Sequence, residues 1–181
     1  MIVVDTNILA YLYFDSERTT LAQAVHQKDQ DWIAPALWRH EFINILAMNV
    51  RFKRLCVDDA VSIWDEALAR LAGSEFYPDT GEVIRIAQAN MISAYDAQFI
   101  ALARQKGVVC VTEDKEMLKK CPDITLTMEA FIDGGPLVVR EKKAKYTAKK
   151  KAHPVRRVKP YKAKFPLTEE FINAAKREGR A

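Results

Sequence analysis

Short apolar runs rich in β-branched residues recur along the first 132 residues, and longer segments with helical spacing separate them. Such runs are typical of strands that are buried on both faces. They occur at residues 2–4, 32–34, 108–111 and 124–126, with a further short strand expected at residues 76–77. The pattern therefore predicts several short strands distributed along this part of the chain.

The segments between these runs carry apolar residues at the three- and four-residue spacing of helices. Helices are expected at residues 17–28, 36–55, from an N-cap at 57–59 to residue 71, at 80–89, at 94–106, and briefly around residues 117–118. Ser93 and Gly107 delimit the clearest of them as its N-cap and its C-terminal stop. Strands that alternate with helices predict a three-layer α/β domain around a mainly parallel sheet.

The sequence changes character after Gly134-Gly135-Pro136, where the α/β pattern ends. Residues 1–136 carry 13 Lys/Arg and 20 Asp/Glu, a net charge of −7, whereas residues 137–181 carry 15 and 4, a net charge of +11. We therefore expect an α/β domain at residues 1–135 and a basic extension at residues 136–181. An acidic body with a basic extension suggests a polyanionic partner such as a nucleic acid, although a solvated tail without a specific role has the same composition.

The basic extension has two parts. Residues 140–164 lack helical or strand periodicity and are expected to be extended. Thr168 as an N-cap, acids in the first turn and bases in the last then predict a short amphipathic helix at about residues 168–177. A helix of about ten residues is marginal alone, so it needs a surface on which to dock.

Cysteine usage and hydropathy limit the class of protein. Three isolated cysteines without a metal-ligand spacing argue against a disulfide framework or a zinc site and favour a reducing compartment. The opening residues lack the basic leader of a signal peptide. No apolar run approaches the roughly 18 residues that span a bilayer. A soluble, cytoplasmic protein without a membrane partner is expected.

Four carboxylates come from the ends of strands or the starts of helices, namely Asp5, Glu41, Asp96 and Asp114. Asp5 directly follows the first strand, and Asp114 lies just beyond the strand at residues 108–111. Both therefore belong to the carboxyl edge of the predicted sheet, where ligands bind in open parallel sheets. Glu41 and Asp96 lie near the starts of helices that face the same edge. If the two strands are neighbours, all four carboxylates can meet in one pocket.

A cluster of this kind suits a divalent cation. Clustered carboxylates raise one another's pKa unless a cation lies between them. Mg²⁺ is the natural occupant because it is usually held by a few carboxylates together with waters and substrate phosphate. Such a site activates water for attack on a phosphodiester. The sequence places no histidine as a general base, which favours metal-activated water.

Each acid also has a purely structural interpretation. Asp96 lies three residues after Ser93, as in a capping pair. Asp5 can cap the turn that follows it, Glu41 can be a solvated helix position, and Asp114 can be an acid favoured by the helix dipole. Spacing alone leaves these interpretations open for each residue, although all four are less probable together than singly.

Around these acids the sequence resembles the PIN-domain family, and in particular the VapC-type toxins of bacterial and archaeal toxin–antitoxin systems. The matching segments are VVDTNIL at residues 3–9, PALWRHE at 35–41, AYDAQFIALA at 94–103 and VTED at 111–114. Their order and spacing fit the family over about residues 1–132. Four ordered motifs are far more specific than any one of them.

The resemblance implies a five-stranded parallel sheet, a homodimer, and Mg²⁺- or Mn²⁺-dependent endonuclease activity on single-stranded RNA, with a cognate antitoxin protein as a partner. It makes Asp5 and Asp96 the principal metal carboxylates. Glu41 and Asp114 complete the pocket directly or through water, and Asn7 and Thr112 are supporting hydrogen-bonding residues. The basic extension departs from the pattern, because typical toxins of this kind end near the last strand or helix.

The basic extension has two functional interpretations. Basic residues interleaved with aromatics suit phosphate contacts and base stacking, which favours an RNA-gripping arm. The candidates are Lys149, Lys150, Lys151, Arg156, Arg157 and Lys159. In the other interpretation the extension inhibits the acidic site by covering it, in its own or a neighbouring subunit, while Phe171 and Ile172 are buried on an apolar surface. Antitoxins of the family commonly place a basic, partly helical segment over the toxin's acidic pocket, so an antitoxin-like segment fused to the toxin is a further form of this interpretation.

Other protein classes fit the sequence less well. A haloacid-dehalogenase-like phosphatase needs a second aspartate at position 7, where Asn7 stands. No G-x-G-x-x-G follows a strand, so a dinucleotide-binding enzyme is unsupported. The non-enzyme alternative is a non-catalytic RNA-binding module on a PIN scaffold, and the presence of all four acids argues against it.

Overall fold

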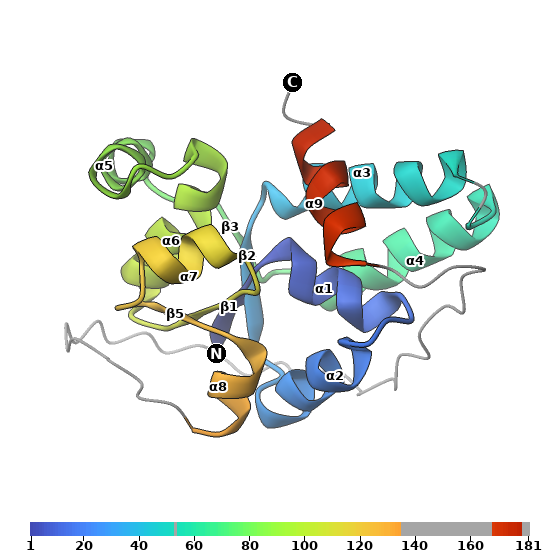
Figure 1. The fold of residues 1–181 in the computed structure, drawn as a ribbon, viewed down its shortest axis with the longest axis horizontal. Coiled ribbons are helices and arrows are strands. Elements are labelled where there is room, and N and C mark those ends of the chain that lie inside the picture. The colour runs from blue at the N-terminus through green and yellow to red at the C-terminus, as the bar shows by residue number, and fades with distance from the viewer. Residues whose placement is uncertain (53, 135–167, 179–181) are drawn as a thin grey trace.

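A five-stranded parallel sheet forms the centre of the protein (Figure 1). The computed structural model describes residues 1–52, 54–134 and 168–178. The strands are β1 (Ile2–Val4), β2 (Trp32–Pro35), β3 (Glu75–Phe76), β4 (Cys110–Val111) and β5 (Thr125–Leu126). They lie in the order β3-β2-β1-β4-β5, and every neighbouring pair is parallel. The predicted α/β class and the five-stranded parallel sheet are confirmed.

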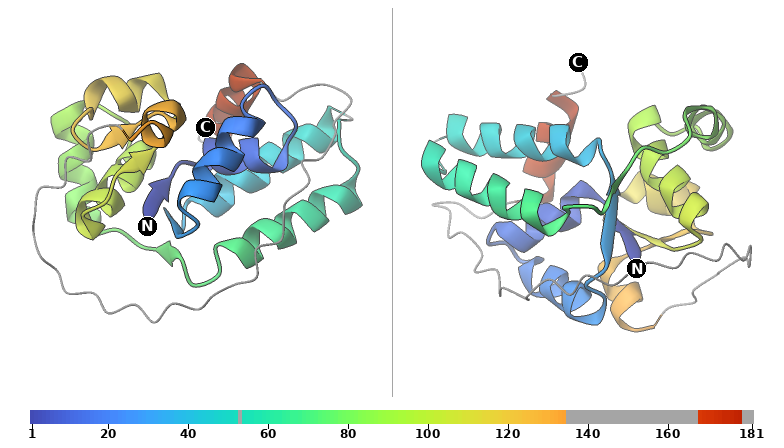
Figure 2. Two further views of the ribbon diagram at one scale, coloured as in Figure 1. Left: turned by 90° about the horizontal axis from the view of Figure 1, so that it is seen from below. Right: turned by 180° about the vertical axis from the view of Figure 1, so that it is seen from behind.

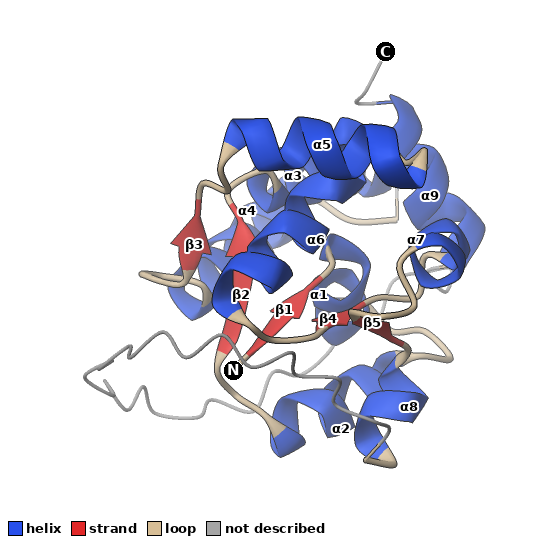
Figure 3. Cartoon of the chain, turned by 90° about the vertical axis from the view of Figure 1, so that its left-hand side faces the viewer, coloured by secondary structure: helices blue, strands red, loops and turns tan. Residues whose placement is uncertain are grey.

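Helices cover both faces of the sheet, so the predicted three layers are present (Figures 2 and 3). They are α1 (Thr6–Tyr13), α2 (Thr19–Lys28), α3 (Trp38–Arg51), α4 (Val57–Arg70), α5 (Thr80–Asn90), α6 (Ala94–Lys106), α7 (Lys115–Lys120), α8 (Met128–Ile132) and α9 (Glu169–Glu178). The alternation of side chains along β1 separates the two cores. Ile2 and Val4 pack with α1–α4, α8 and α9, whereas Val3 packs with α5–α7.

Most helix boundaries agree with the sequence prediction, with a few informative differences. Helix α1 follows β1 with no intervening loop, although no helix was expected there. Helix α4 takes Cys56 as its N-cap, whose sulfur accepts a hydrogen bond from the Asp59 amide at 3.3 Å, so the predicted cap at residues 57–59 was one residue late. Helix α5 ends at Met91 in the left-handed conformation, with φ of 53°, rather than at a glycine.

The topology places a crevice beside β1. The chain moves from β1 outward through β2 to β3, and then returns to the other side of β1 for β4 and β5. The register pairs Val3 with Cys110 and Val4 with Val111, so the carboxyl ends of β1 and β4 lie side by side. Ligands bind at such a reversal of strand order in open α/β sheets. The strands that precede Asp5 and Asp114 are therefore neighbours, as these two residues require in order to lie close together.

The terminal helix α9 packs against α3 (Figures 1 and 2). The helix expected at about residues 168–177 is therefore present, and Ile172 is fully buried in the larger core cluster. Phe171 packs edge-on against Phe52, with ring centroids 6.0 Å apart, and Arg54 lies over the Phe171 ring at 4.2 Å. The six basic residues proposed as RNA contacts, from Lys149 to Lys159, lie outside the described residues.

Within the part of the chain that the structure describes, no helix has the length and apolar character needed to cross a membrane.

Candidate active site

Asp5 lies at the carboxyl end of the central strand and is fully buried, with 0% of its surface exposed. Its amide donates to the Val111 carbonyl at 3.0 Å, which ties it to the neighbouring strand. It occupies the N-cap position of α1, but its side chain accepts no capping hydrogen bond from that helix. The capping interpretation of Asp5 is therefore wrong, and its buried carboxylate needs another explanation.

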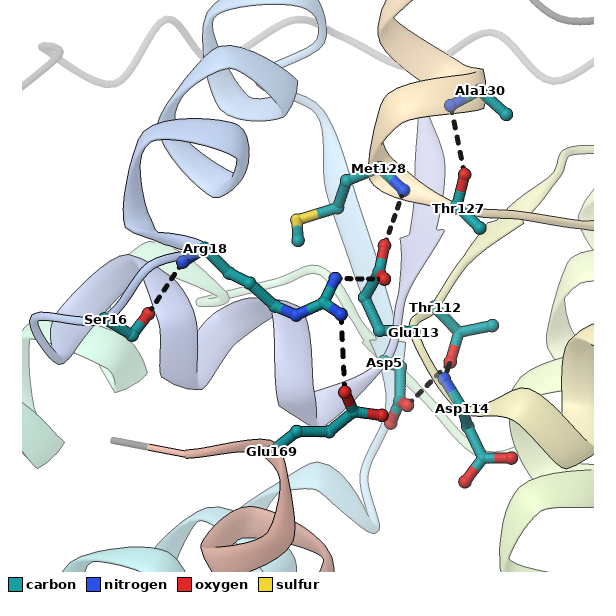
Figure 4. Close-up of polar contacts among 10 residues, drawn as sticks. All are labelled: Asp5, Ser16, Arg18, Thr112, Glu113, Asp114, Thr127, Met128, Ala130 and Glu169. Atoms are coloured by element: carbon teal, nitrogen blue, oxygen red, sulfur yellow. Dashed lines mark hydrogen bonds and ion pairs between the residues drawn. The ribbon is translucent and has the colours of Figure 1, made fainter. Parts of the chain in front are cut away.

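Thr112 connects Asp5 to Asp114. The Thr112 hydroxyl donates to Asp5 Oδ2 at 2.8 Å and accepts from the Asp114 amide at 3.0 Å. Asp114 Oδ1 then accepts from the amides of Glu116 and Met117, each at 2.9 Å, and so caps α7. Figure 4 shows the three side chains in this order. Thr112 therefore holds the Asp5 carboxylate and the Asp114 backbone together, and Asp114 has a structural role as the N-cap of α7.

Glu41 approaches the same edge of the sheet from the first turn of α3. It is 5% exposed, and its Oε2 accepts a hydrogen bond from the Thr6 hydroxyl at 2.6 Å. Thr6 directly follows Asp5, so this bond places the first turn of α3 next to the end of β1. A solvated helix position, the structural alternative for Glu41, is excluded by its burial.

Asp96 lies in the first turn of α6, which packs against β1 and β2. It is 7% exposed. Its Oδ2 accepts from the Ser93 hydroxyl at 2.7 Å, and the Asp96 amide donates to Ser93 Oγ at 3.1 Å. The capping pair suggested by the sequence therefore exists. It also holds the Asp96 carboxylate in one orientation, as a ligand position requires.

The donor set has the chemistry that Mg²⁺ or Mn²⁺ prefers, since all its groups are oxygens. Asn7 contributes a buried amide oxygen that lacks a hydrogen-bond partner among the described residues. Across those residues, however, no group of three or more His, Cys, Asp or Glu side chains is arranged to hold a metal ion. Mg²⁺ is commonly held by one or two carboxylates with several waters, so these residues fit such an ion. Metal binding stays a prediction.

Three residues beside the acids were not predicted from the sequence as parts of the site, namely Thr6, Arg18 and Glu113. Glu113 is buried, and its Oε1 accepts from the Met128 amide at 2.9 Å while Oε2 pairs with Arg18. Arg18 also pairs with Glu169 of α9 at 3.3 Å. A hydroxyl next to an acid, as in Asp5-Thr6, and an acid pair after a buried strand, as in Glu113-Asp114, were the available signals.

Comparisons of this chain with known proteins give matches that agree with one another. The family model described as "PIN domain" matches residues 2–122. Ribonuclease VapC3 of Pyrobaculum aerophilum is 26% identical over 124 residues, which cover 67% of this chain and 95% of that protein. The crystal structure of PAE2754 from Pyrobaculum aerophilum superposes with a TM-score of 0.57 at 22% identity, over 74% of this chain and 94% of that one. The last comparison bears on the fold alone.

Proposed function

The chain belongs to the PIN domain family, and on that basis we propose that it is a Mg²⁺- or Mn²⁺-dependent endoribonuclease that cleaves single-stranded RNA. The distant relationship to Ribonuclease VapC3 supports RNA as the substrate. We propose further that it is the toxin of a toxin–antitoxin pair, and, from the resemblance of its motifs to VapC-type toxins, that it acts as a homodimer in the cytoplasm.

One observation carries the proposal. Three buried carboxylates are each held by a hydroxyl donor, with Thr112 bonded to Asp5, Thr6 to Glu41 and Ser93 to Asp96. A buried carboxylate costs free energy unless polar or positively charged groups stabilise it. A hydroxyl bond offsets part of that cost, and a metal cation would offset more of it. Such an arrangement suits binding of a cation better than it suits packing.

The acids have separate roles in the proposed reaction. Asp5 and Asp96 would hold the metal ion, and Glu41 and Asp114 would hold it directly or through water. The metal supplies a polarised water and neutralises charge on the phosphodiester. Thr112 keeps the Asp5 carboxylate oriented through its hydrogen bond to Oδ2. Ser93 orients Asp96 in the same way, and the burial of both acids limits competing solvent.

The proposal is tested with the full chain and a labelled single-stranded RNA. We expect cleavage with added Mg²⁺ or Mn²⁺, no cleavage with EDTA, and recovery when the metal is restored. A preparation of Asp5→Asn, purified in parallel, controls for contaminating nucleases. Cleavage that continues unchanged in EDTA, or equally in that variant, would reject the assignment.

A further inference from the structure

Arg18 lies between two carboxylates that belong to different parts of the chain. It precedes α2, and its guanidinium pairs with Glu113 after β4 and with Glu169 at the start of α9, the latter at 3.3 Å. Figure 4 shows the guanidinium reaching between them, with Asp5 and Asp114 drawn beyond Glu113. The Arg18 guanidinium thus connects the loop after β4, which carries Glu113 and Asp114, to the terminal helix α9.

The two carboxylates differ in how firmly they are held. Glu113 is buried, and its second oxygen accepts from the Met128 amide, so it belongs to the body. Glu169 has a side chain that is 26% exposed, and it is carried by α9, a helix separated from α8 by residues 133–168 of the sequence. Glu169 is therefore the anion that can be replaced at Arg18, while Glu113 stays.

The Tyr11 side chain, which lies next to Arg18, provides a further hydrogen-bond donor. The Arg18 guanidinium lies 5.9 Å from the centre of its ring, and its buried hydroxyl has no hydrogen-bond partner within the described part of the chain. Burial raises the pKa of Tyr11, Arg18 lowers it, and the carboxylates of Glu169, Glu113 and Asp5 raise it further. The Tyr11 hydroxyl is therefore within electrostatic reach of Arg18, Glu169, Glu113 and Asp5.

A phosphate fits the position of the Glu169 carboxylate. Both present acceptor oxygens with negative charge, and a guanidinium binds either through paired hydrogen bonds. A neutral tyrosine hydroxyl can donate to a phosphate oxygen. Clustered acids otherwise repel a polyanion, so a positive group at their edge is what a nucleic-acid backbone needs in order to approach.

We infer that Arg18 and the Tyr11 hydroxyl form a subsite for a backbone phosphate of the RNA, and that Glu169 occupies this subsite when α9 is docked. Docked α9 and RNA therefore exclude each other at Arg18. The inference rests on the proposed function, which supplies RNA as the ligand. It gives the terminal helix a defined inhibitory contact, independent of the basic residues that precede it.

The direct test compares two neighbouring glutamates in the full chain. Binding of a labelled single-stranded RNA is followed by fluorescence anisotropy in EDTA, where cleavage is not expected. Glu169→Gln should tighten binding about 3- to 5-fold more than Glu170→Gln, which removes the same charge from an exposed position. Because both variants change the net charge equally, the difference between them isolates the contact with Arg18. Equal effects of the two variants would overturn the inference.

Variants of the subsite itself give a second, independent readout. Arg18→Gln should weaken RNA binding about 10-fold, and in that background Glu169→Gln should act no differently from Glu170→Gln. Tyr11→Phe should weaken RNA binding while leaving the free energy of unfolding unchanged or raised, because the hydroxyl it removes has no partner. If Arg18→Gln folds poorly, Arg18→Lys keeps the charge and removes the paired geometry. Tyr11→Phe that lowers stability and leaves RNA binding unchanged would contradict the subsite.

The outcomes separate this inference from the proposed function. Metal-dependent cleavage with equal effects of Glu169→Gln and Glu170→Gln would retain the nuclease and reject the subsite. A chain that neither cleaves nor binds RNA in any variant would reject both. RNA binding that responds to Glu169 and Arg18, without cleavage under any metal, would retain the phosphate subsite and reject catalysis.

Discussion

Asp5 and Glu169 both present a carboxylate near Tyr11, but the protein holds them in opposite ways. Asp5 is part of the core, with its amide bonded to Val111 and its side chain bonded to Thr112. Glu169 stands on α9, whose described side-chain contacts include those of Ile172 and Phe171 and the ion pair of Glu169 with Arg18. The comparison teaches that the acids of the proposed site are fixed before any ligand binds, whereas α9 has an attachment that can be exchanged.

The energies of the two attachments support this distinction. Removing Asp5 from its surroundings means separating β1 from β4, in the middle of the sheet. Among the described contacts of α9, full burial of Ile172 contributes about 1.5–3 kcal/mol and the partly exposed ion pair of Glu169 at most about 1 kcal/mol. Ordering the helix offsets part of that gain. The ion pair between Glu169 and Arg18 can therefore be exchanged at a small cost in free energy.

The largest effect on RNA cleavage is expected from substitution of the buried acids in the α/β domain. Asp5→Asn and Asp96→Asn each remove a negative charge from the proposed metal site and should lower the rate of RNA cleavage at least about 100-fold, the scale of losing a key electrostatic element. The matched control is Asp65→Asn on the exposed surface of α4. Full activity of both site variants at low metal concentration would show that these acids are a structural cluster.

The second prediction weakens the attachment of α9 alone. Ile172→Asp puts a charge into the apolar surface that buries Ile172. It should make the free energy of docking of α9 less favourable by about 2 kcal/mol. Hydrogen exchange of the α9 amides should accelerate, while the thermal midpoint of the body changes little. Ala174→Asp, on the exposed face of the same helix, should leave exchange nearly unchanged. Loss of the whole fold in Ile172→Asp would show that α9 is part of the core rather than an exchangeable element.

The fold was predictable where its local pattern was distinctive. Helix α6 was predicted from Ser93 to Gly107 because it has both an N-cap and a left-handed stop. Helix α1 was missed because all its residues are buried, so it lacks the polar face that marks an amphipathic helix. Helix α8, at Met128–Ile132, is too short to show a period. The end of α5 at Met91 carries no glycine to signal it.

The closeness of Asp5 and Asp114 at one edge of the sheet was predictable, but the hydrogen bonds around the acids were not. Neighbouring strands β1 and β4 brought Asp5 next to Thr112, as the motif order suggested. The bond from Thr6 to Glu41 depends on how α3 packs, which spacing along the chain does not encode. The same holds for Arg18, because its partners Glu113 and Glu169 lie 95 and 151 residues away.

The third prediction concerns how firmly the body holds Asp5. Thr112→Val removes the hydroxyl that bonds Asp5 and accepts from the Asp114 amide, while it keeps the shape of the side chain. We expect cleavage to fall about 10-fold, the equivalent of one buried hydrogen bond to a charged group. Thr125→Val, in the neighbouring strand β5, removes a buried hydroxyl bond of the same length, 2.8 Å, to the carbonyl of Cys121 at the end of α7. It should lower stability by a similar amount and leave the cleavage rate per folded molecule unchanged.

The smallest effect is expected from pH, which acts on the body at a point remote from α9. Burial, followed by the charge of Arg70, lowers the pKa of His26 from 6.5 to about 4, and His26 lies 2.6 Å from the Arg70 guanidinium. The folded protein therefore keeps His26 neutral while the unfolded chain takes up a proton below pH 6.5. Stability is full above that pH, falls between pH 6.5 and pH 4, and is level with respect to this group below pH 4. Because solvent reaches the partly buried ring, we expect a loss of only about 1 kcal/mol across the window.

Denaturant unfolding as a function of pH measures this loss of stability. His26→Gln should flatten the slope, whereas His40→Gln, at an exposed position, should keep it. An unchanged slope in His26→Gln would place the acid sensitivity of the body elsewhere, in groups that α9 or the carboxylates contribute.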